Sequence, residues 1–210
     1  MKKNKTKAFT LIELLIAVTI FSIASSVIYS SFRLGVLSWK RSEDVLKKYQ
    51  KIRYAVNLLS EDIAGTFIFK DIQFKGDEAR IEFPGLVECA AAGAKTVGRI
   101  SYEFSQSSGR LLRLKQSYRE ALNTASTGGE ELLSDVIDFK ISYCYKLPDS
   151  EEPGWLGEWF VEEKIPAGVK MELVVKDNYS PDGKMIFVKR INIPTGEMLG
   201  MEELKNESEK

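Results

Sequence analysis

The segment KTKAFTLIELLIAVTIFSIASSVIYSSF, residues 5–32, joins a basic start to a long apolar run that contains one acid, Glu13. The lysines at positions 2, 3, 5 and 7 precede the run, and positive charge before an apolar segment favours a cytoplasmic N-terminus. A helix over residues 9–32 would be roughly 36 Å long, at about 1.5 Å per residue, which is enough to cross a bilayer. The segment therefore predicts a membrane helix.

The acid within this run needs an explanation, because a charge at the bilayer centre costs about 2–3 kcal/mol. A cleavable signal peptide has an apolar core of about 7–15 residues followed by small residues, and Ala24, Ser25 and Ser26 resemble such a site. The apolar pattern continues past them to Phe32, which argues against that alternative. A plain uncleaved anchor leaves Glu13 unexplained.

The helical pattern continues beyond the apolar run. Apolar residues recur at spacings of four and three, which places them on one helix face: Val45, Tyr49, Ile52, Val56, Leu59 and Ile63. We expect one helix from about Phe9 to Ile63, with Gly65 as its stop. Its second half should pack this stripe on a C-terminal domain.

After Gly65 the pattern changes to short runs rich in β-branched and aromatic residues. The predicted strands are 67–74, 79–83, 98–105, 110–118, 135–147, 169–177 and 184–193. Residues 105–109 and 178–183 carry hairpin signals. No strand–helix–strand alternation is present, so the fold class is α+β, with one long N-terminal helix on an antiparallel β domain.

Three further segments have distinct compositions. Residues 86–98 are small and Ala-rich, and we expect a loop or a short helical turn there. Residues 147–159 are acidic and rich in Pro and Gly, which favours an exposed loop. The charged tail, residues 201–210, is expected to be flexible.

The composition limits the possible functions. The 210 residues include 30 basic and 30 acidic side chains, so the net charge is zero and no nucleic-acid partner is indicated. There is no His, which removes the commonest general base and metal ligand. We expect no enzyme activity, no catalytic residue, no cofactor and no metal site. The two cysteines, Cys89 and Cys144, are either two separate buried thiols or one disulfide.

Several polar groups were weighed as sites and set aside. Asp177, Asn178 and Asp182 could bind calcium, but a hairpin turn explains them better. The adjacent acids 151–152 and 162–163 are expected to be solvated. The cations on strand 110–118 are expected to form a solvated sheet face: Arg110, Arg113 and Lys115.

The string KAFTLIELLIAVTIF closely resembles the class III signal of type IV pilins and type II secretion pseudopilins. The resemblance implies that prepilin peptidase cuts between Ala8 and Phe9 and that Phe9 is then N-methylated. Glu13 becomes the fifth mature residue, and the resemblance implies that it pairs with the Phe9 amine of a neighbouring subunit. Ala8 departs from the usual Gly, and we expect slower cleavage.

The runs after residue 98 resemble those of the minor pseudopilin GspJ family of type II secretion systems. The shared segments are 99–116, 132–146, 157–159, 165–177 and 186–194. One family pattern is occupied here by Trp159, Pro166, Val169, Met171 and Leu173. The resemblance implies a role in the pseudopilus tip complex, which primes pseudopilus assembly and supports export of folded proteins across the outer membrane. The alternative is a minor pilin of a type IV pilus, which has the same signal.

The resemblance also implies partners and a location. The partners are GspI-, GspK- and GspH-like minor pseudopilins, the major pseudopilin, prepilin peptidase and the inner membrane. The chain would cross the bacterial inner membrane once, with its C-terminal domain in the periplasm. The expected organisation is a leader (1–8), a transmembrane half-helix (9–32), a stalk helix packed on the sheet (33–64), an antiparallel β domain (65–200) and a flexible tail (201–210).

Overall fold

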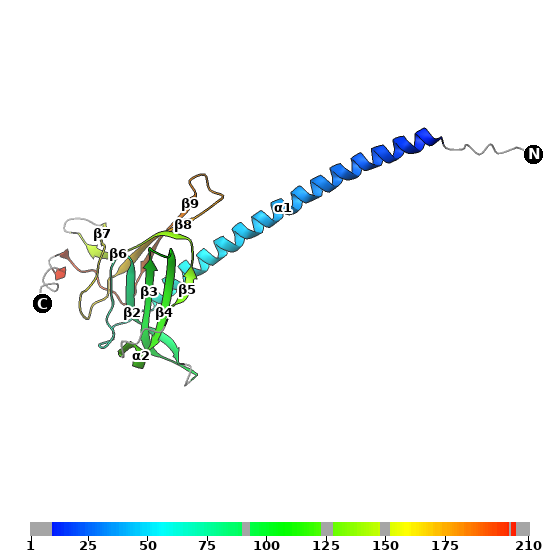
Figure 1. Cartoon of the computed structure of the whole chain (residues 1–210). Coiled ribbons are helices and arrows are strands. Elements are labelled where there is room, and N and C mark those ends of the chain that lie inside the picture. Colours follow the sequence, from blue (N-terminus) through cyan, green and yellow to red (C-terminus); the bar gives the residue numbers. More distant parts are fainter. Residues whose placement is uncertain (1–9, 90–92, 123–127, 148–151, 202, 205–210) are drawn as a thin grey trace, which may run out of the picture. The chain divides into compact units, whose positions relative to one another are not determined.

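The computed structural model describes residues 10–89, 93–122, 128–147, 152–201 and 203–204 (Figure 1). The chain divides into two compact units, Met1–Gln50 and Lys51–Lys210. The first unit contains most of helix α1 (Leu11–Ala64), and the second contains the end of that helix and all of the strands. The α+β fold class is confirmed.

Helix α1 begins and ends close to the predicted bounds. It runs from Leu11 to Ala64, against an expected Phe9 to Ile63, and Phe9 itself lies outside the described residues. At its end, the Gly65 amide donates to the Glu61 carbonyl at 3.0 Å, which closes the last turn. Glycine is a common residue just past a helix end, and Gly65 is confirmed as the stop.

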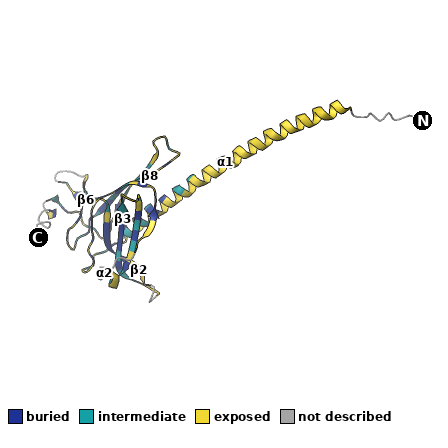
Figure 2. Ribbon diagram, viewed as in Figure 1, coloured by how far each residue is buried: buried dark blue, intermediate teal, exposed yellow. Residues whose placement is uncertain are grey.

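The apolar stripe of α1 is buried only near the end of the helix (Figure 2). Ile52, Leu59 and Ile63 are 1%, 1% and 0% exposed and belong to the core of the second unit, whereas Tyr49 is 42% exposed. The predicted packing of the stripe is therefore confirmed for its last three turns. These turns fold as part of the β domain.

Two antiparallel sheets make up the rest of the second unit. The first has the order β1-β2-β3-β4-β5 and the second the order β7-β6-β8-β9. The strands are β1 (Lys75–Gly76), β2 (Arg80–Cys89), β3 (Ala94–Ser105), β4 (Arg110–Ser117), β5 (Glu130–Leu133), β6 (Val136–Lys146), β7 (Pro153–Leu156), β8 (Gly168–Lys176) and β9 (Lys184–Asn192). Short helix α2 (Tyr118–Leu122) follows β4.

One expected strand was wrong, and one expected loop was wrong in part. Residues 67–74 form no strand, and their backbone pairs with no other strand in the described structure. Their aromatic rings pack on other side chains instead: Phe69 lies edge-on to Tyr118, with ring centroids 5.8 Å apart. Residues 86–89 and 94–98 belong to the β2–β3 pair, in register as far as Cys89 and Ala94, so the expected loop or helical turn is wrong for them. Gly93 lies in a turn, and residues 90–92 lie outside the described residues. Small residues carry no strong strand signal, but the pairing with a neighbouring strand decides their conformation.

The expected loop 147–159 is also wrong in part. Residues 153–156 form β7, which pairs with β6, and Trp159 is 1% exposed, with its indole Nε1 donating to the Lys164 carbonyl at 3.2 Å. Gly154 allows the close pairing, because a Cβ there would lie 2.2 Å from the Tyr145 ring. The sequence also gave no signal for the short elements β5 and α2.

The start of the predicted flexible tail is folded. Leu204 is 9% exposed and belongs to the core cluster, so the expectation of a flexible tail is wrong at this residue. Residues 205–210 lie outside the described residues.

A buried ionic group joins the end of α1 to the first sheet. Arg113 of β4 is 6% exposed and forms an ion pair with Asp62 of α1. The Tyr102 hydroxyl of β3 donates to Asp62 Oδ2 at 2.5 Å. Burial, followed by the hydrogen bond to Asp62, raises the pKa of Tyr102.

The expected solvated face of β4 was therefore wrong for Arg113 but not for its neighbours. Arg110 forms an ion pair with Glu131 at 3.3 Å and is more than half exposed, and Lys115 is exposed. Arg113 lies on the opposite face of β4 from Arg110, where the end of α1 supplies a carboxylate. That carboxylate is 51 residues away in the sequence.

We predict that Asp62→Ala will lower the free energy of unfolding of the second unit by about 3 kcal/mol, because it leaves the buried Arg113 guanidinium without its counter-charge. The measurement is urea unfolding of the full chain in detergent micelles, followed by fluorescence and near-UV circular dichroism. Glu43→Ala, which breaks the exposed Glu43–Lys47 pair of α1, is the control and should change little. Equal midpoints for both variants would contradict the prediction.

Candidate functional site

The first turn of α1 is the candidate functional site. Thr10 and Glu13 form a capping box: the Thr10 amide donates to Glu13 Oε2 at 3.0 Å, and the Thr10 hydroxyl donates to the same oxygen at 3.1 Å. In return, the Glu13 amide donates to Thr10 Oγ1 at 3.4 Å. A capping box satisfies amide groups that the first helical turn leaves without partners.

This geometry gives Glu13 a role within its own chain. The carboxylate lies in the first turn, where the helix dipole also favours negative charge. Both hydrogen bonds are made by Oε2, and Oε1 makes none with the described residues. The site thus holds a carboxylate in a fixed position with one oxygen still available to another donor.

Sequence analysis missed Thr10. The signal was present, because Thr followed three residues later by Glu, ahead of an apolar run, is the pattern of a capping box. Ala8 and Phe9, the predicted cleavage and methylation residues, lie outside the described residues. Cleavage after Ala8 and methylation of Phe9 therefore stay predictions.

The helix that follows is suited to lipid. Its most apolar window has a mean hydropathy of 2.3 and is unburied, so α1 is long and apolar enough to cross a membrane. Ser22, Ser26 and Ser30 each donate to the carbonyl four residues earlier, at 2.8 Å. Because hydrocarbon offers no hydrogen-bond partner, these internal bonds make the hydroxyls compatible with lipid.

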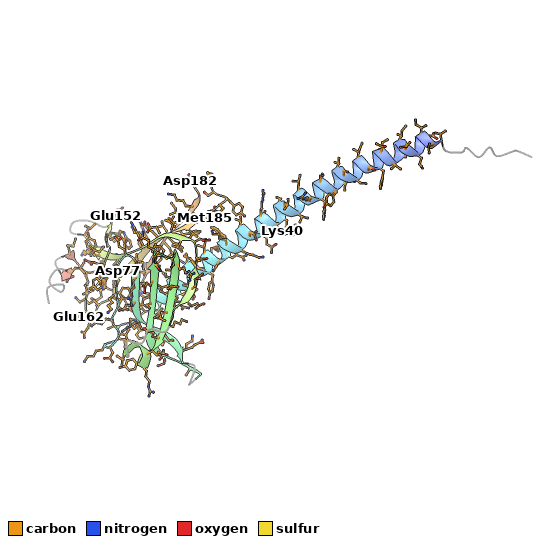
Figure 3. The ribbon with its side chains drawn as sticks, in the orientation of Figure 1. Lys40, Asp77, Glu152, Glu162, Asp182 and Met185 are labelled. Carbon is orange, nitrogen blue, oxygen red and sulfur yellow. The ribbon has the colours of Figure 1, made fainter. Side chains whose placement is uncertain are left out.

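The polar groups that the sequence offered as weaker candidates form a turn or are exposed. Asp177 Oδ1 accepts from the Tyr179 amide at 3.1 Å, and the Asp177 amide donates to the Gly183 carbonyl at 2.8 Å, which is a hairpin turn closed by its own side chain. Figure 3 labels Glu152 and Glu162, which are exposed. Among the described residues, no group of three or more acidic or Cys side chains is placed to hold a metal ion.

Cys144 is the cysteine whose side chain the structure describes. Cys144 is 4% exposed, and its Sγ lies 3.4 Å from the Met198 sulfur. Burial raises the pKa of the Cys144 thiol, which favours its protonated form. The side chain of Cys89 lies outside the described residues, and a disulfide between the two stays a prediction.

Comparison with known families identifies the same segment. Residues 3–29 match the family described as the prokaryotic N-terminal methylation motif. The chain carries a pilin-type processing signal. No curated protein matches the chain at a significant level. The motif, with one long apolar helix followed by antiparallel sheets, points to a membrane-anchored, type IV pilin-like protein with a structural rather than an enzymatic role.

We predict that Thr10→Val will loosen the first turn of α1. Loss of a capping hydroxyl costs about 1 kcal/mol, so amide hydrogen exchange at Glu13 and Leu14, whose amides donate to Thr10, should accelerate about fivefold in lipid nanodiscs. Thr19→Val is the matched control, because its hydroxyl only returns a bond to the Leu15 carbonyl within the helix. Unchanged exchange in Thr10→Val would show that the capping box does not hold the helix start.

Proposed function

We propose that this chain is a minor pseudopilin of a type II secretion system and a member of its tip complex. The methylation motif at residues 3–29 supports the proposal. Pilins and pseudopilins, whose signal this segment resembles, are processed and then assembled through their N-terminal helix. In this role the chain primes pseudopilus assembly with GspI-, GspK- and GspH-like partners. It thereby supports export of folded proteins across the outer membrane.

The choice of the GspJ family rests on the order of the β runs after residue 98. The residues that carry one of its patterns are buried core positions, such as Trp159, Val169 and Leu173, at 1%, 0% and 0% exposure. Core positions constrain the fold more than the partner. The assembly role therefore rests on the N-terminal segment, and the particular family rests on the looser pattern.

The assembly contact proposed for Glu13 is compatible with its capping box. Removal of residues 1–8 would create a positively charged amine at Phe9, one helical turn before Glu13. In hydrocarbon an unpaired charge is costly, so pairing Glu13 Oε1 with the amine of a neighbouring subunit would favour one axial register. The bonds within the chain use Oε2, so both contacts can exist together.

Mass spectrometry of the chain from its native membrane tests the processing step. We expect a mature N-terminus at Phe9 that carries one methyl group. Ala8→Gly should raise the fraction of processed chain, because the peptidase site no longer has to accommodate a methyl group. An unprocessed chain, or a terminus elsewhere, would contradict the processing proposal.

Two substitutions at one position separate capping from charge. Glu13→Gln keeps an oxygen that can accept from Thr10 but removes the charge, and Gln is the usual alternative in a capping box. If charge pairing drives assembly, Glu13→Gln and Glu13→Leu should both insert into the membrane, yet both should lose most incorporation into the pseudopilus, measured by co-purification with the other pseudopilins. If Glu13→Gln assembles normally, the acid acts only as a cap.

The secretion role itself needs a different measurement. Deletion of the gene should stop export of the folded substrates of the secretion system and leave surface pili and twitching motility intact. The opposite pattern would assign the chain to a type IV pilus as a minor pilin.

A further inference from the structure

The strand β9 forms an unusual edge. Among the described residues the two sheets have four edge strands, and three of them are short: β1 has 2 residues, β5 has 4 and β7 has 4. β9 has 9 residues, all of them paired with β8 on one side. No strand in the described part of the chain pairs with its other side. Proteins normally keep edge strands short or cover them, because an open edge is a template for another strand.

The exposed side chains of β9 alternate along the strand from Lys184, and we call them its outward row. This row is apolar in its middle. Ile186 is 61% exposed and Val188 is 59% exposed. Their partners on β8, Val174 and Glu172, are only partly buried, so nothing in the described structure covers this row. Figure 3 labels Met185 at the start of β9 and Asp182 in the turn before it, which helps to locate the strand.

Cations flank these two aliphatic residues. Lys184 and Arg190 are exposed and lie in the same row, one on each side of the aliphatic pair, and exposed Asn192 ends the row. In the described part of the chain neither forms an ion pair with a carboxylate, although Arg190 lies over the Trp155 ring, 5.8 Å from its centroid. Lys170 lies over the same ring at 5.5 Å. Trp155 belongs to β7, the opposite edge strand of the same sheet, and tryptophan and arginine are enriched among the residues that contribute most to protein interfaces.

The inward row of β9 is already occupied. Ile191 is 6% exposed and belongs to the core, and Lys189 Nζ donates to Asn57 Oδ1 of α1 at 3.2 Å. The inward row of β9 thus contacts the rest of the domain, whereas its outward row and free edge face solvent. The free edge therefore belongs to a strand that is paired along its whole length, not to a loop.

We propose that the free edge of β9 binds an extended acidic segment of another polypeptide, which adds a strand to the second sheet. The outward row of β9 reads cation, aliphatic, aliphatic, cation at positions 184, 186, 188 and 190. A complementary strand places acids opposite the cations and aliphatic residues opposite Ile186 and Val188, because residues directly opposite across strands interact most strongly. The row is symmetric, so the same pattern fits a parallel or an antiparallel strand.

Charge argues against a second copy of this chain as the occupant. Antiparallel pairing of two β9 strands about Phe187 would put Lys184 of one copy opposite Arg190 of the other, at both ends of the pair. Like charges directly opposite are destabilising. The proposal is independent of the secretion role, since it concerns the β domain and not the N-terminal segment.

Peptide binding tests the proposal with the full chain in detergent micelles. The probe is a labelled nonapeptide, Thr-Glu-Thr-Val-Thr-Val-Thr-Glu-Thr, and the readout is fluorescence anisotropy. We expect saturable binding of this peptide. A second peptide, with lysines in place of both glutamates, should bind about tenfold more weakly, because it loses the attractive charge contacts. Methylation of alternate peptide amides should abolish binding, because the added strand then loses its backbone hydrogen bonds.

Charge reversal on the protein supplies the internal control. Arg190→Glu should weaken binding of the glutamate peptide about tenfold and strengthen binding of the lysine peptide. Stronger binding of the lysine peptide also shows that the variant is folded. Lys115→Glu, a reversal at an exposed cation of the other sheet, should leave both affinities unchanged. Equal binding of the two peptides to the natural chain, or no effect of Arg190→Glu, would overturn the proposal.

A photocrosslinking residue at position 188 tests the surface in native membranes. Cross-linked peptides identified by mass spectrometry should come from an acidic, extended segment of a different protein. The same residue placed at position 115 is the control. Cross-links only between copies of this chain, or none above the control, would overturn the proposal.

Discussion

One uninterrupted helix, α1, has to be stable in two different surroundings, and the rest of the structure depends on this constraint. Its first half is apolar all round and unburied, whereas its last turns present a narrow stripe to a protein core. A helix can do both because all its backbone hydrogen bonds are internal, whatever surrounds it. The side chains then decide which surroundings each part accepts.

The polar groups of the helix follow the same division. In the apolar half, hydroxyls such as that of Ser26 donate to carbonyls of the same helix, and Glu13 closes a capping box with Thr10. In the last turns, Asp62 instead finds its partners on two strands, Tyr102 and Arg113. Polar groups are satisfied locally where lipid is expected and by distant residues where a core is formed.

The β domain positions these last turns and leaves one edge open. The sheets bury aromatic residues such as Trp159 and Tyr143 around the end of α1, and most of their edges are short. The long edge at β9 is the exception. Its exposed charges are basic, whereas the charge in the apolar segment of α1 is the acid Glu13. The two surfaces that we propose for contacts with other chains are thus separate: a charged helix start in an apolar segment, and a basic and aliphatic strand edge on the β domain.

The sequence by itself determined the helix, the change to antiparallel strands and the processing motif. These follow from local signals: the apolar period of α1, the alternation in runs such as 135–147, the glycine at position 65 and the spacing from Lys to Phe to Glu near the start. The capping residue Thr10 was also readable from the sequence, although we did not predict it. Local signals suffice here because each depends on residues within a few positions of one another.

Only the tertiary structure decided which side of a strand is buried and which edges remain open. The sequence indicated a solvated cation at Arg113 because its partner Asp62 is 51 residues away. It indicated a loop at residues 86–89 and 94–98 because small residues take their conformation from the neighbouring strand. Likewise, the sequence of β9 shows a strand, but its free edge depends on the order of the strands in the second sheet. Contacts between residues far apart in the chain set these features, and no pattern along a single segment carries them.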